Sequence, residues 1–478
     1  MPSAPTLASP NTLSSERPYR WAAVGLGAAF VFVLAAVLAL AALDASALYA
    51  IPLLPVGAYV WLRVARHRLA YYWALMAFFG VQSGFSVGVS PLEVAFGLFY
   101  ALYLAQWFYE RVYARGERVL VTSTDKVLFA FLLYLLVAAG LGAFFGAEPM
   151  ALASDLANFS TLALYFPTKE IVQRERHGAW HVLAILLLLG VLCSAFNCSE
   201  YSEKVSNASF AWQVARGRVT SNEMLLLIGS LVGLGLSVLV RNTLVRAASL
   251  VAFAIALAGL LLTQFRAYYV DFALGVLVIS VLVRGRQKAA LVGLLISGTV
   301  VLGALMFYVV GDALLLMAYG LVDRVLSIRT AGEMDISVLN RLLETRRVIE
   351  LIVENPVVGY GLGVEFGFYD AIYDRTWVKT FVHNGYLMLW YKFGIIGLGM
   401  ILWLWLSTIR MGWRACRSTL KDPSRRAAVL LGTAVLISLL PSHVTSAAFS
   451  TMDTLVAFGT LLGLVAGAAR PQAVAERA

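Results

Sequence analysis

A histidine and a small set of arginines are the residues of this chain whose types and positions could do chemistry. His383 opens the sequence His383-Asn384-Gly385-Tyr386-Leu387, at the point where a long polar stretch ends and an apolar run begins. A neutral imidazole at that place could take a proton from a hydroxyl nucleophile at neutral pH. A capping or interfacial histidine would have the same position, so position alone leaves both interpretations open.

Three arginines lie next to apolar runs, where a charge is costly unless it faces a polar cavity or a bound anion. Arg266 separates two such runs, and Arg216 and Arg218 come just before a third. A guanidinium binds phosphate oxygens through two donors at once, so three converging arginines would suit a diphosphate group. Anchoring to lipid headgroups is the alternative for each arginine taken singly.

His383 closes a polar stretch from about 311 to 383, which is the one long interruption of the apolar pattern. Within it, the apolar positions of residues 337–354 fall on one stripe of a helix. Asn355-Pro356 ends this helix, and residues 359–363 (GYGLG) follow, where glycine permits positive φ or close backbone approach. The predicted helix would lie against the membrane surface or roof a cavity.

Arg341, Arg346 and Arg347 on this predicted helix have two interpretations. They would line the same cavity as the other arginines, or they would pair with Glu344 and Glu350 on a solvated face, at i,i+3 and i,i+4 spacing. We expect the second for Arg346 and leave both open for Arg341.

The composition indicates the fold class. The 478 residues are 60% hydrophobic and 13% charged, their mean hydropathy is +0.81, and runs long enough to cross a membrane as helices recur along the chain. We predict an all-α polytopic membrane protein with about 12, and up to 14, transmembrane helices and both termini in the cytoplasm. The runs near 47–62 and 153–167 are shorter than a full crossing. The predicted divisions are a disordered cytoplasmic tail at 1–20, N-terminal membrane helices at 21–310, a large helical periplasmic loop at 311–383, C-terminal membrane helices at 384–469 and a cytoplasmic tail at 470–478.

The net charge of +10 would suggest nucleic acid as the partner of a soluble protein. Here the basic clusters lie between alternate apolar runs, as the positive-inside rule requires. They fall at 63–68, 111–118, 169–176, 241–246, 284–288 and 410–426. We interpret them as topology determinants that contact membrane lipids, and we expect no nucleic-acid partner.

Metal, ATP and disulfide chemistry are not indicated. The predicted periplasmic loops contain no DxD, HExxH or close grouping of His, Asp and Glu, and the chain has no Walker-type phosphate loop. We therefore expect no metal and no cofactor. Of the three cysteines, Cys193 and Cys198 could pair in an oxidising periplasm, but we expect them to be unlinked.

The order of these motifs resembles the O-antigen ligase and polymerase superfamily. Residues 354–363 (ENPVVGYGLG) are similar to a helix end of the form nP-x-x-G-x-G-x-G. Residues 383–387 (HNGYL) are similar to an HN-x-x-L entry into the next span, and residues 394–398 (GIIGL) follow it.

Two upstream elements extend the resemblance. Residues 263–267 (TQFRA) match a T-x-S-R-G stretch that contains Arg266, although serine and glycine are replaced by phenylalanine and alanine. Arg218 with Asn222 resembles a shortened gR…N element, in which Arg216 or Arg218 is the equivalent arginine.

This resemblance implies a GT-C-like glycosyltransferase of the bacterial inner membrane, with its active site facing the periplasm. The donor would be O-antigen on undecaprenyl diphosphate, and the acceptor would be a sugar hydroxyl of lipid A–core, so that transfer completes lipopolysaccharide. His383 would be the general base of an inverting, metal-independent reaction. Arg218 and Arg266, with Arg216 and Arg341, would offset the charge on the departing diphosphate.

Three other functions stay open. An O-antigen polymerase would extend the same lipid-linked glycan, and a protein O-oligosaccharyltransferase would move it to Ser or Thr. We favour the ligase because the loop is of moderate length and no soluble domain follows residue 469. A lipid-linked glycan transporter would need charges near mid-membrane in paired, broken helices, whereas the charges here gather at one face.

Overall fold

The computed structural model describes residues 67–82, 91–207, 219, 222–296, 336–370, 374–418, 420 and 422–470. The predicted tail at 1–20, the predicted spans near 21–62, residues 471–478, and both Arg216 and Arg218 lie outside the described residues. Contacts divide the chain into two compact units. The described parts of Met1–Leu75 and Val94–Arg118 form the first unit, and those of Met76–Glu93 and Val119–Ala478 form the second.

The first unit is packed through aromatic side chains. Its described elements are the start of α3 (Arg68–Gln82), most of α4 (Pro91–Tyr109) and a π-helical turn at Glu110–Ala114. The Tyr71 and Tyr103 rings meet edge to face, and the Tyr71 hydroxyl donates a hydrogen bond to the Phe99 carbonyl at 3.2 Å. None of the described site residues belongs to this unit.

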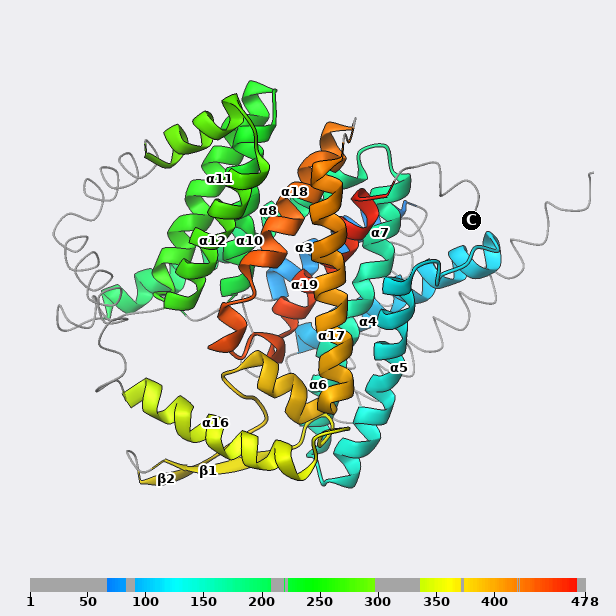
Figure 1. Ribbon diagram of the computed structural model, residues 1–478, viewed down its shortest axis with the longest axis vertical. Coiled ribbons are helices and arrows are strands. Elements are labelled where there is room, and N and C mark those ends of the chain that lie inside the picture. Colours follow the sequence, from blue (N-terminus) through cyan, green and yellow to red (C-terminus); the bar gives the residue numbers. More distant parts are fainter. Residues whose placement is uncertain are drawn as a thin grey trace, which may run out of the picture. The chain divides into compact units, whose positions relative to one another are not determined.

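The second unit contains the helices and strands that carry the described site residues (Figure 1). Its helices before the polar loop are α5 (Ser123–Phe144), α6 (Pro149–Ser160), α7 (Tyr165–Arg174), α8 (Gly178–Ser206), α10 (Glu223–Leu239), α11 (Thr243–Leu262) and α12 (Arg266–Leu282). The loop contributes α16 (Ile336–Glu354), β1 (Phe366–Asp370) and β2 (Arg375–Lys379). The elements after it are α17 (Gly385–Arg417), α18 (Pro423–Ser438), α19 (Met452–Ala468) and two 3-10 turns, η4 (Ser442–Val444) and η5 (Ala448–Ser450).

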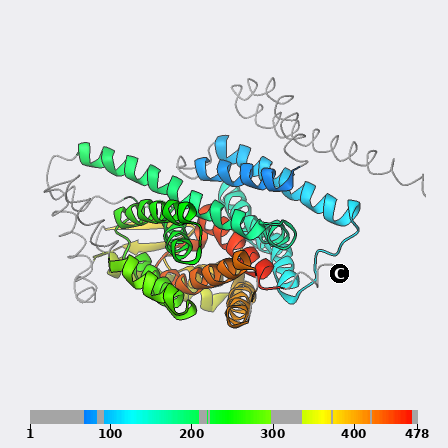
Figure 2. The same cartoon turned by 90° about the horizontal axis from the view of Figure 1, so that it is seen from above.

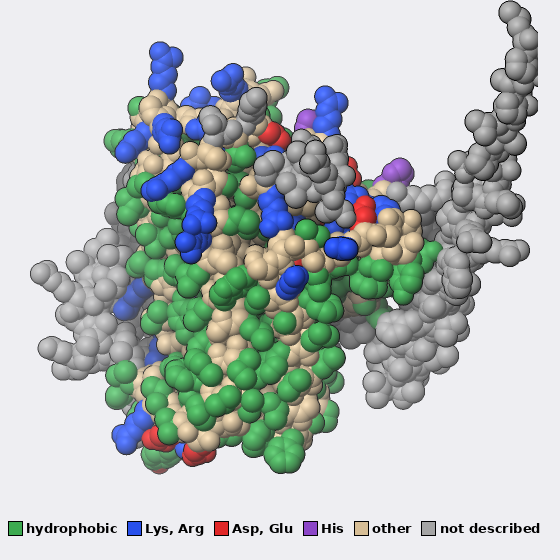
Figure 3. Space-filling view, turned by 45° about the vertical axis from the view of Figure 1, so that its right-hand side comes forward, with side chains coloured by type: hydrophobic (Ala, Val, Ile, Leu, Met, Phe, Trp, Pro, Cys, Tyr) green, Lys and Arg blue, Asp and Glu red, His purple; other side chains and the backbone are tan. Residues whose placement is uncertain are grey.

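The centre of the second unit consists of helices that are apolar on all sides. Nearly every side chain of α10 and α19 is buried, and α19 contacts α7, α10, α17 and α18. The helices α5 and α11 expose leucine, valine and isoleucine side chains, and Figure 2 shows the arrangement of the helices from above. In Figure 3, hydrophobic side chains cover the middle of the bundle, while Lys and Arg gather at its upper end. This distribution is typical of a helical bundle surrounded by lipid.

In the described part of the chain, five helices are long and apolar enough to cross a membrane. They are α5, α8, α11, α17 and the segment Pro423–Val444. α10 and α19 are shorter apolar helices. The predicted class of helical membrane protein agrees with this architecture, and the number of 12 to 14 crossings stays a prediction.

The short apolar run near 153–167 is not one helix. It divides into the end of α6, a 3-10 turn η3 (Thr161–Leu164) and the start of α7. Lys169, which we assigned to a basic loop at 169–176, lies inside α7 and is buried. The prediction of a loop at this position is therefore wrong, because the helix continues to Arg174.

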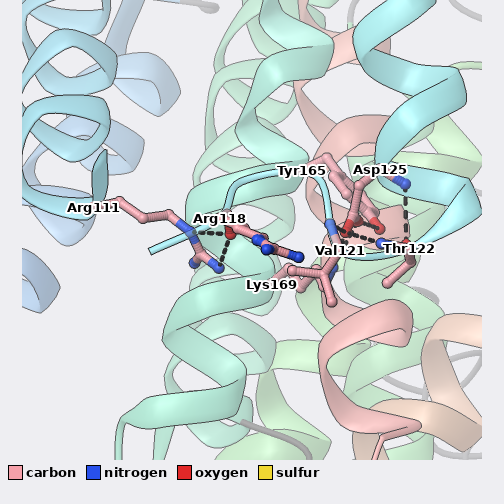
Figure 4. A network of polar contacts seen from close by, with 7 residues as sticks. All are labelled: Arg111, Arg118, Val121, Thr122, Asp125, Tyr165 and Lys169. Carbon is pink, nitrogen blue, oxygen red and sulfur yellow. Dashed lines mark hydrogen bonds and ion pairs between the residues drawn. The ribbon is translucent and has the colours of Figure 1, made fainter. Parts of the chain in front are cut away.

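Lys169 can be buried because Asp125 compensates its charge (Figure 4). Its Nζ lies 2.6 and 2.7 Å from the two carboxylate oxygens, and the Tyr165 hydroxyl donates to the same carboxylate at 2.7 Å. The Thr122 amide donates to the Asp125 side chain and the Asp125 amide to the Thr122 hydroxyl, a capping box that begins α5. The network thus fixes the first turn of α5 to α7.

The Gly-rich turn that follows α16 docks into a break in α17. Gly394 has φ 63° and ψ −172°, so the helical path is interrupted there. The Tyr360 amide donates to the Tyr391 carbonyl at 2.8 Å, and the Ile395 amide donates to the Pro356 carbonyl at 2.9 Å. A continuous helix would pair the Tyr391 carbonyl with the Ile395 amide. The turn therefore supplies hydrogen-bond partners for the Tyr391 carbonyl and the Ile395 amide, which the break in α17 separates.

Close contact between backbones explains why glycine is needed in this turn. Gly361 has φ 90°, a conformation that residues with a Cβ rarely adopt. A Cβ at this position would lie 2.2 Å from the Gly142 amide nitrogen of α5. The following amide, that of Leu362, donates to the Ala138 carbonyl at 3.0 Å. The prediction of positive φ and close backbone approach is confirmed, and the turn is wedged between α5 and α17.

A buried ion pair closes the same docking site. Asp155 of α6 pairs with Lys392 of α17, and its Oδ2 also accepts the Gly363 amide hydrogen at 2.7 Å. Lys392 is 1% exposed, so the pair lies inside the protein.

The polar loop is not wholly helical, contrary to our prediction. β1 and β2 form an antiparallel hairpin in which Phe366 lies opposite Lys379 and Phe368 opposite Trp377. Both phenylalanines are buried, and β1 contacts α16. Alternating side chains of a strand point to opposite faces, so one face of the hairpin packs on α16 while Val378 is exposed.

Candidate active site

His383 forms a close pair with a buried carboxylate of the polar loop. Its Nδ1 lies 2.8 Å from Oε2 of Glu344, and its backbone amide donates to the same oxygen at 3.2 Å. Lys379, at the end of β2, has its Nζ 3.4 Å from the other carboxylate oxygen. Three segments of the loop, namely α16, β2 and the residue before α17, therefore meet at Glu344.

The sequence around His383 sets the position of its side chain. Asn384 is the N-cap of α17, and its side-chain oxygen accepts the amide hydrogens of Tyr386 and Leu387 at 3.1 and 3.0 Å. His383 is thus the last residue before a capped helix. The backbone amide of His383 also bonds to Glu344. The backbone is therefore fixed on both sides of His383, which sets the position of the imidazole.

The imidazole is polarised and open to solvent at its other end. Glu344 is 1% exposed, whereas the His383 side chain is 32% exposed. A carboxylate accepts hydrogen bonds, so we assign the proton of the neutral imidazole to Nδ1, which leaves the Nε2 lone pair free. Among the described residues no group bonds to Nε2. A substrate hydroxyl could therefore reach this nitrogen and give up its proton.

The charge of Glu344 is favoured by its partners. Burial by itself raises the pKa of Glu344, but the hydrogen bond from the His383 side chain, the charges of His383 and Lys379, and the His383 amide together lower the pKa below its ordinary value. The residue therefore stays ionised at neutral pH. An ionised carboxylate holds the imidazole in one tautomer and stabilises the imidazolium that forms when the base takes a proton.

Glu344 is the site residue that the sequence interpretation misplaced. One of the two interpretations of the loop arginines placed it on a solvated face as their partner, and that alternative does not hold for Glu344, which is buried and bonds to His383 and Lys379. The expectation for Arg346 is confirmed, since it pairs with Glu350 at 3.4 Å. A signal was present in the spacing, because residues 344, 348 and 352 form one i,i+4 row and the last two are buried apolar residues.

Arg266 is the first residue of α12 and is half-buried. The turn before it is well ordered: Gln264 has a positive φ of 49°, and the Phe265 amide donates to the Thr263 hydroxyl at 3.2 Å. The Val219 amide donates to the Leu262 carbonyl at 3.3 Å. The residue after Arg218 is therefore placed beside the turn that leads to Arg266, although Arg218 itself lies outside the described residues.

Arg341 lies on α16, three residues before Glu344 and thus on the same side of the helix. Neither Arg341 nor Arg266 makes a hydrogen bond or ion pair with His383 or Glu344 within the described structure. The structure therefore brings His383 together with Glu344 and Lys379. The joint site of His383 with the four arginines stays a prediction.

His443, which lies in the turn η4 between α18 and α19, has a different environment. It is fully buried, and its Nδ1 lies 2.7 Å from the Leu439 carbonyl oxygen. Its ring packs against the rings of Trp405 and Phe449. A histidine without access to solvent cannot exchange a proton with a substrate in this conformation.

The described residues contain no group of three or more His, Cys, Asp or Glu side chains placed to hold a metal ion. Cys193, Cys198 and Cys416 are free, in agreement with the expectation of unlinked cysteines.

Comparison with known families bears directly on the segment that carries this site. Residues 251–404 match the family model described as O-antigen ligase, and the match includes Arg266, Arg341, Glu344 and His383. No curated protein has a significant match to the chain. The expected resemblance is confirmed over this segment, which is similar to the O-antigen ligase family.

Proposed function

We propose that this protein moves O-antigen polysaccharide from undecaprenyl diphosphate to a sugar hydroxyl of lipid A–core at the periplasmic face of the inner membrane. The match of residues 251–404 to the O-antigen ligase family model supports a ligase- or polymerase-type reaction in a multi-pass membrane protein. The choice of donor, acceptor and membrane face belongs to the proposal.

The observation that carries the proposal is the pair formed by His383 and Glu344. A buried carboxylate binds one nitrogen of an imidazole whose other nitrogen is open, at 2.8 Å between Nδ1 and Oε2. This is the arrangement of a general base whose tautomer is set by a neighbouring acid. A histidine that served only as a helix cap would not need a buried carboxylate, since Asn384 already caps α17.

The group transfer is a single displacement. The acceptor hydroxyl oxygen attacks the anomeric carbon of the donor sugar while the bond from that carbon to the phosphate oxygen breaks. The hydroxyl proton goes to His383 Nε2, and the electron pair of the broken bond leaves with undecaprenyl diphosphate. Attack opposite the leaving group inverts the anomeric configuration. Glu344 stabilises the positive imidazolium that results.

The leaving diphosphate gains negative charge in the transition state, and arginines would offset it. Arg266 at the first turn of α12 is one of these, because backbone N–H groups and the dipole of a helix N-terminus also favour an anion there. We assign Arg218, with Arg216 and Arg341, to the same diphosphate. The active site would then need no metal.

The proposal is tested with purified protein, lipid-linked O-antigen and lipid A–core in one assay. The expected product is O-antigen on lipid A–core. A lengthened lipid-linked glycan would instead identify a polymerase, and a glycosylated protein acceptor would identify an oligosaccharyltransferase. Lipid-linked glycan that crosses the bilayer unchanged would identify a transporter.

His383→Ala should reduce turnover by about 100- to 10,000-fold, the usual contribution of a general base. The matched control is His177→Ala, because His177 is exposed and its side chain makes no cap bond at the start of α8. Both variants should keep the melting temperature of the native protein. Near-normal turnover by His383→Ala would exclude the base role.

Arg266→Ala should lower turnover on the order of 100-fold, as for loss of one donor to a developing anion. Arg266→Lys should recover only part of it, because lysine retains the charge but loses the two-donor fork. Arg346→Ala, whose surface side chain is 82% exposed, is the control. If Arg266→Ala unfolds the protein instead, Arg266 anchors the helix and does not bind the diphosphate.

A further inference from the structure

One side of α16 exposes large apolar side chains in a row. Leu342 is 60% exposed, Ile349 46% and Val353 73%, and their spacing places them on one stripe of the helix with Leu339. Four exposed apolar residues on one helix face would be unfavourable in water. The stripe therefore requires an apolar partner.

The other two sides of α16 are already assigned. Val348 and Ile352 are buried in the row that also contains Glu344, where β1 and α17 contact the helix. Arg347 lies on a third side and pairs with Glu350 at 3.3 Å, and Glu350, which also pairs with Arg346, lies at the border between that side and the stripe. The exposed stripe thus faces away from the protein core and is bordered by charged side chains.

The C-terminal end of α16 is fixed at a definite depth along the bundle. The turn that follows it bonds to Ala138, six residues before the end of α5, and to Tyr391, six residues after the start of α17. At 1.5 Å per residue, the contact with Ala138 lies about 9 Å inside the end of α5, whereas Tyr391 precedes the break in α17 at Gly394. The helix α5 is long and apolar enough to cross a membrane. The turn that follows α16 therefore reaches the level of lipid beside α5.

The stripe also continues into a surface that faces lipid. Val357, just after α16, is 53% exposed, and its carbonyl accepts the Ile396 amide hydrogen at 3.4 Å. Ile395 and Ile396 on α17 are themselves exposed. Figure 1 shows α16 running across the lower end of the bundle, crosswise to α17 and α5. An apolar surface thus extends from a membrane-crossing helix along α16.

We propose that α16 is an interfacial helix whose stripe of Leu339, Leu342, Ile349 and Val353 is buried in the membrane leaflet at the loop end of the bundle. Its partner is the phospholipid of that leaflet. Arg346 falls within the stripe and is 82% exposed, which suits a long side chain that extends from the acyl region to a lipid phosphate. This lipid contact exists whichever reaction the site performs.

The inference is tested by spin labelling in vesicles of phosphatidylethanolamine and phosphatidylglycerol. The full chain with Cys193→Ala, Cys198→Ser and Cys416→Ser receives one new cysteine, Leu342→Cys or Val353→Cys, and a nitroxide label. Labels at both positions should collide more often with oxygen, which concentrates in lipid, than with a water-soluble nickel complex. The control is Arg347→Cys on the third side of the same helix, where the preference should reverse.

Two results would overturn the proposal. A Val353 label that behaves like the Arg347 label would show that the stripe faces water. A Val353 label that neither reagent reaches would show that protein covers the stripe, either the 297–335 segment of the same chain or a second copy. The Leu342 label repeats the measurement at the other end of the stripe, and an unchanged melting temperature confirms that each labelled variant is folded.

Discussion

Two carboxylates hold cationic or basic side chains at the start of α17, and they do so in opposite ways. Asp155 binds Lys392 and the Gly363 amide in a site where Lys392 is 1% exposed. Glu344 is 1% exposed, but it binds an imidazole that is 32% exposed. The first site buries the basic side chain, and the second leaves one of its nitrogens open.

The difference indicates what each site can do. A buried ion pair with all its groups satisfied can position backbone, and Asp155 does so by joining α6, α17 and the Gly-rich turn. A pair with an accessible titratable atom can exchange a proton with a substrate. The same type of interaction is therefore structural at Lys392 and, in our proposal, catalytic at His383.

The largest expected effect on stability is at the closed site. Lys392→Met should lower the free energy of unfolding by about 3–5 kcal/mol, because it leaves the Asp155 charge buried without a partner. Thermal denaturation in detergent measures the change. Arg346→Ala should cost about 1 kcal/mol or less, because its pair with Glu350 is at the surface.

The double variant Asp155→Asn with Lys392→Met separates charge from packing. It removes both charges and keeps an oxygen that can accept the Gly363 amide hydrogen, so it should recover much of the lost stability. If Lys392→Met alone is as stable as the native protein, the Asp155–Lys392 pair does not have the structural role that distinguishes it from the His383–Glu344 pair.

At the open site the expected effect is on turnover. Glu344→Gln keeps the shape but removes the charge that stabilises the imidazolium, and loss of the carboxylate that fixes the tautomer of a general base lowers kcat by up to about 10,000-fold. Because Glu344 positions His383 and does not touch substrate, kcat should fall more than KM changes. Steady-state kinetics in which one substrate is varied while the other is saturating measure both.

Two comparisons decide whether Glu344 acts through His383. Glu350→Gln, on the same helix but at the surface, should leave kcat unchanged. Glu344→Asp should restore part of the activity, since the carboxylate is retained. Equal losses of kcat in Glu344→Gln and Glu350→Gln would mean that α16 has only a general structural role.

The sequence indicated the open site better than the closed one. His383 and Arg266 stand out because they interrupt apolar runs. The glycines of residues 359–363 indicated a turn with positive φ angles, and the structure has such a turn there. Asp155 and Lys392 are 237 residues apart in sequence, and neither belongs to a local pattern. Only the tertiary structure brings the two residues together, so their spacing in the sequence could not predict the ion pair.

Glu344 shows how a local rule can mislead. The rule that charges three or four residues apart pair on a helix predicted arginine partners for it. That rule holds for Glu350, which is exposed, and fails for Glu344, because the loop folds β2 and His383 over its side of α16. The hairpin was also not predicted, since its five-residue strands lie within a segment that we expected to be helical.

The smallest expected effect is the pH dependence of the open site. The pKa of Glu344 is lower in the folded protein than its ordinary value of 4.5, so the folded state binds this proton less readily than the unfolded state. The stabilising contribution is therefore complete above pH 4.5 and is lost as the pH falls below that value, through the folded-state pKa. Melting temperatures of the native protein and of Glu344→Gln should differ most near neutral pH and converge in acid.

The comparison with Glu350→Gln makes this result specific. Other carboxylates titrate in the same range, but they are common to all three proteins and cancel in the differences. Glu350 is 48% exposed in its ion pairs, so its replacement should give a small difference that changes little with pH. A difference for Glu344→Gln that grows as the pH falls would mean that burial outweighs the partners. Glu344 would then be protonated in the folded protein. The imidazole of His383 would lose the neighbouring negative charge that stabilises its protonated form.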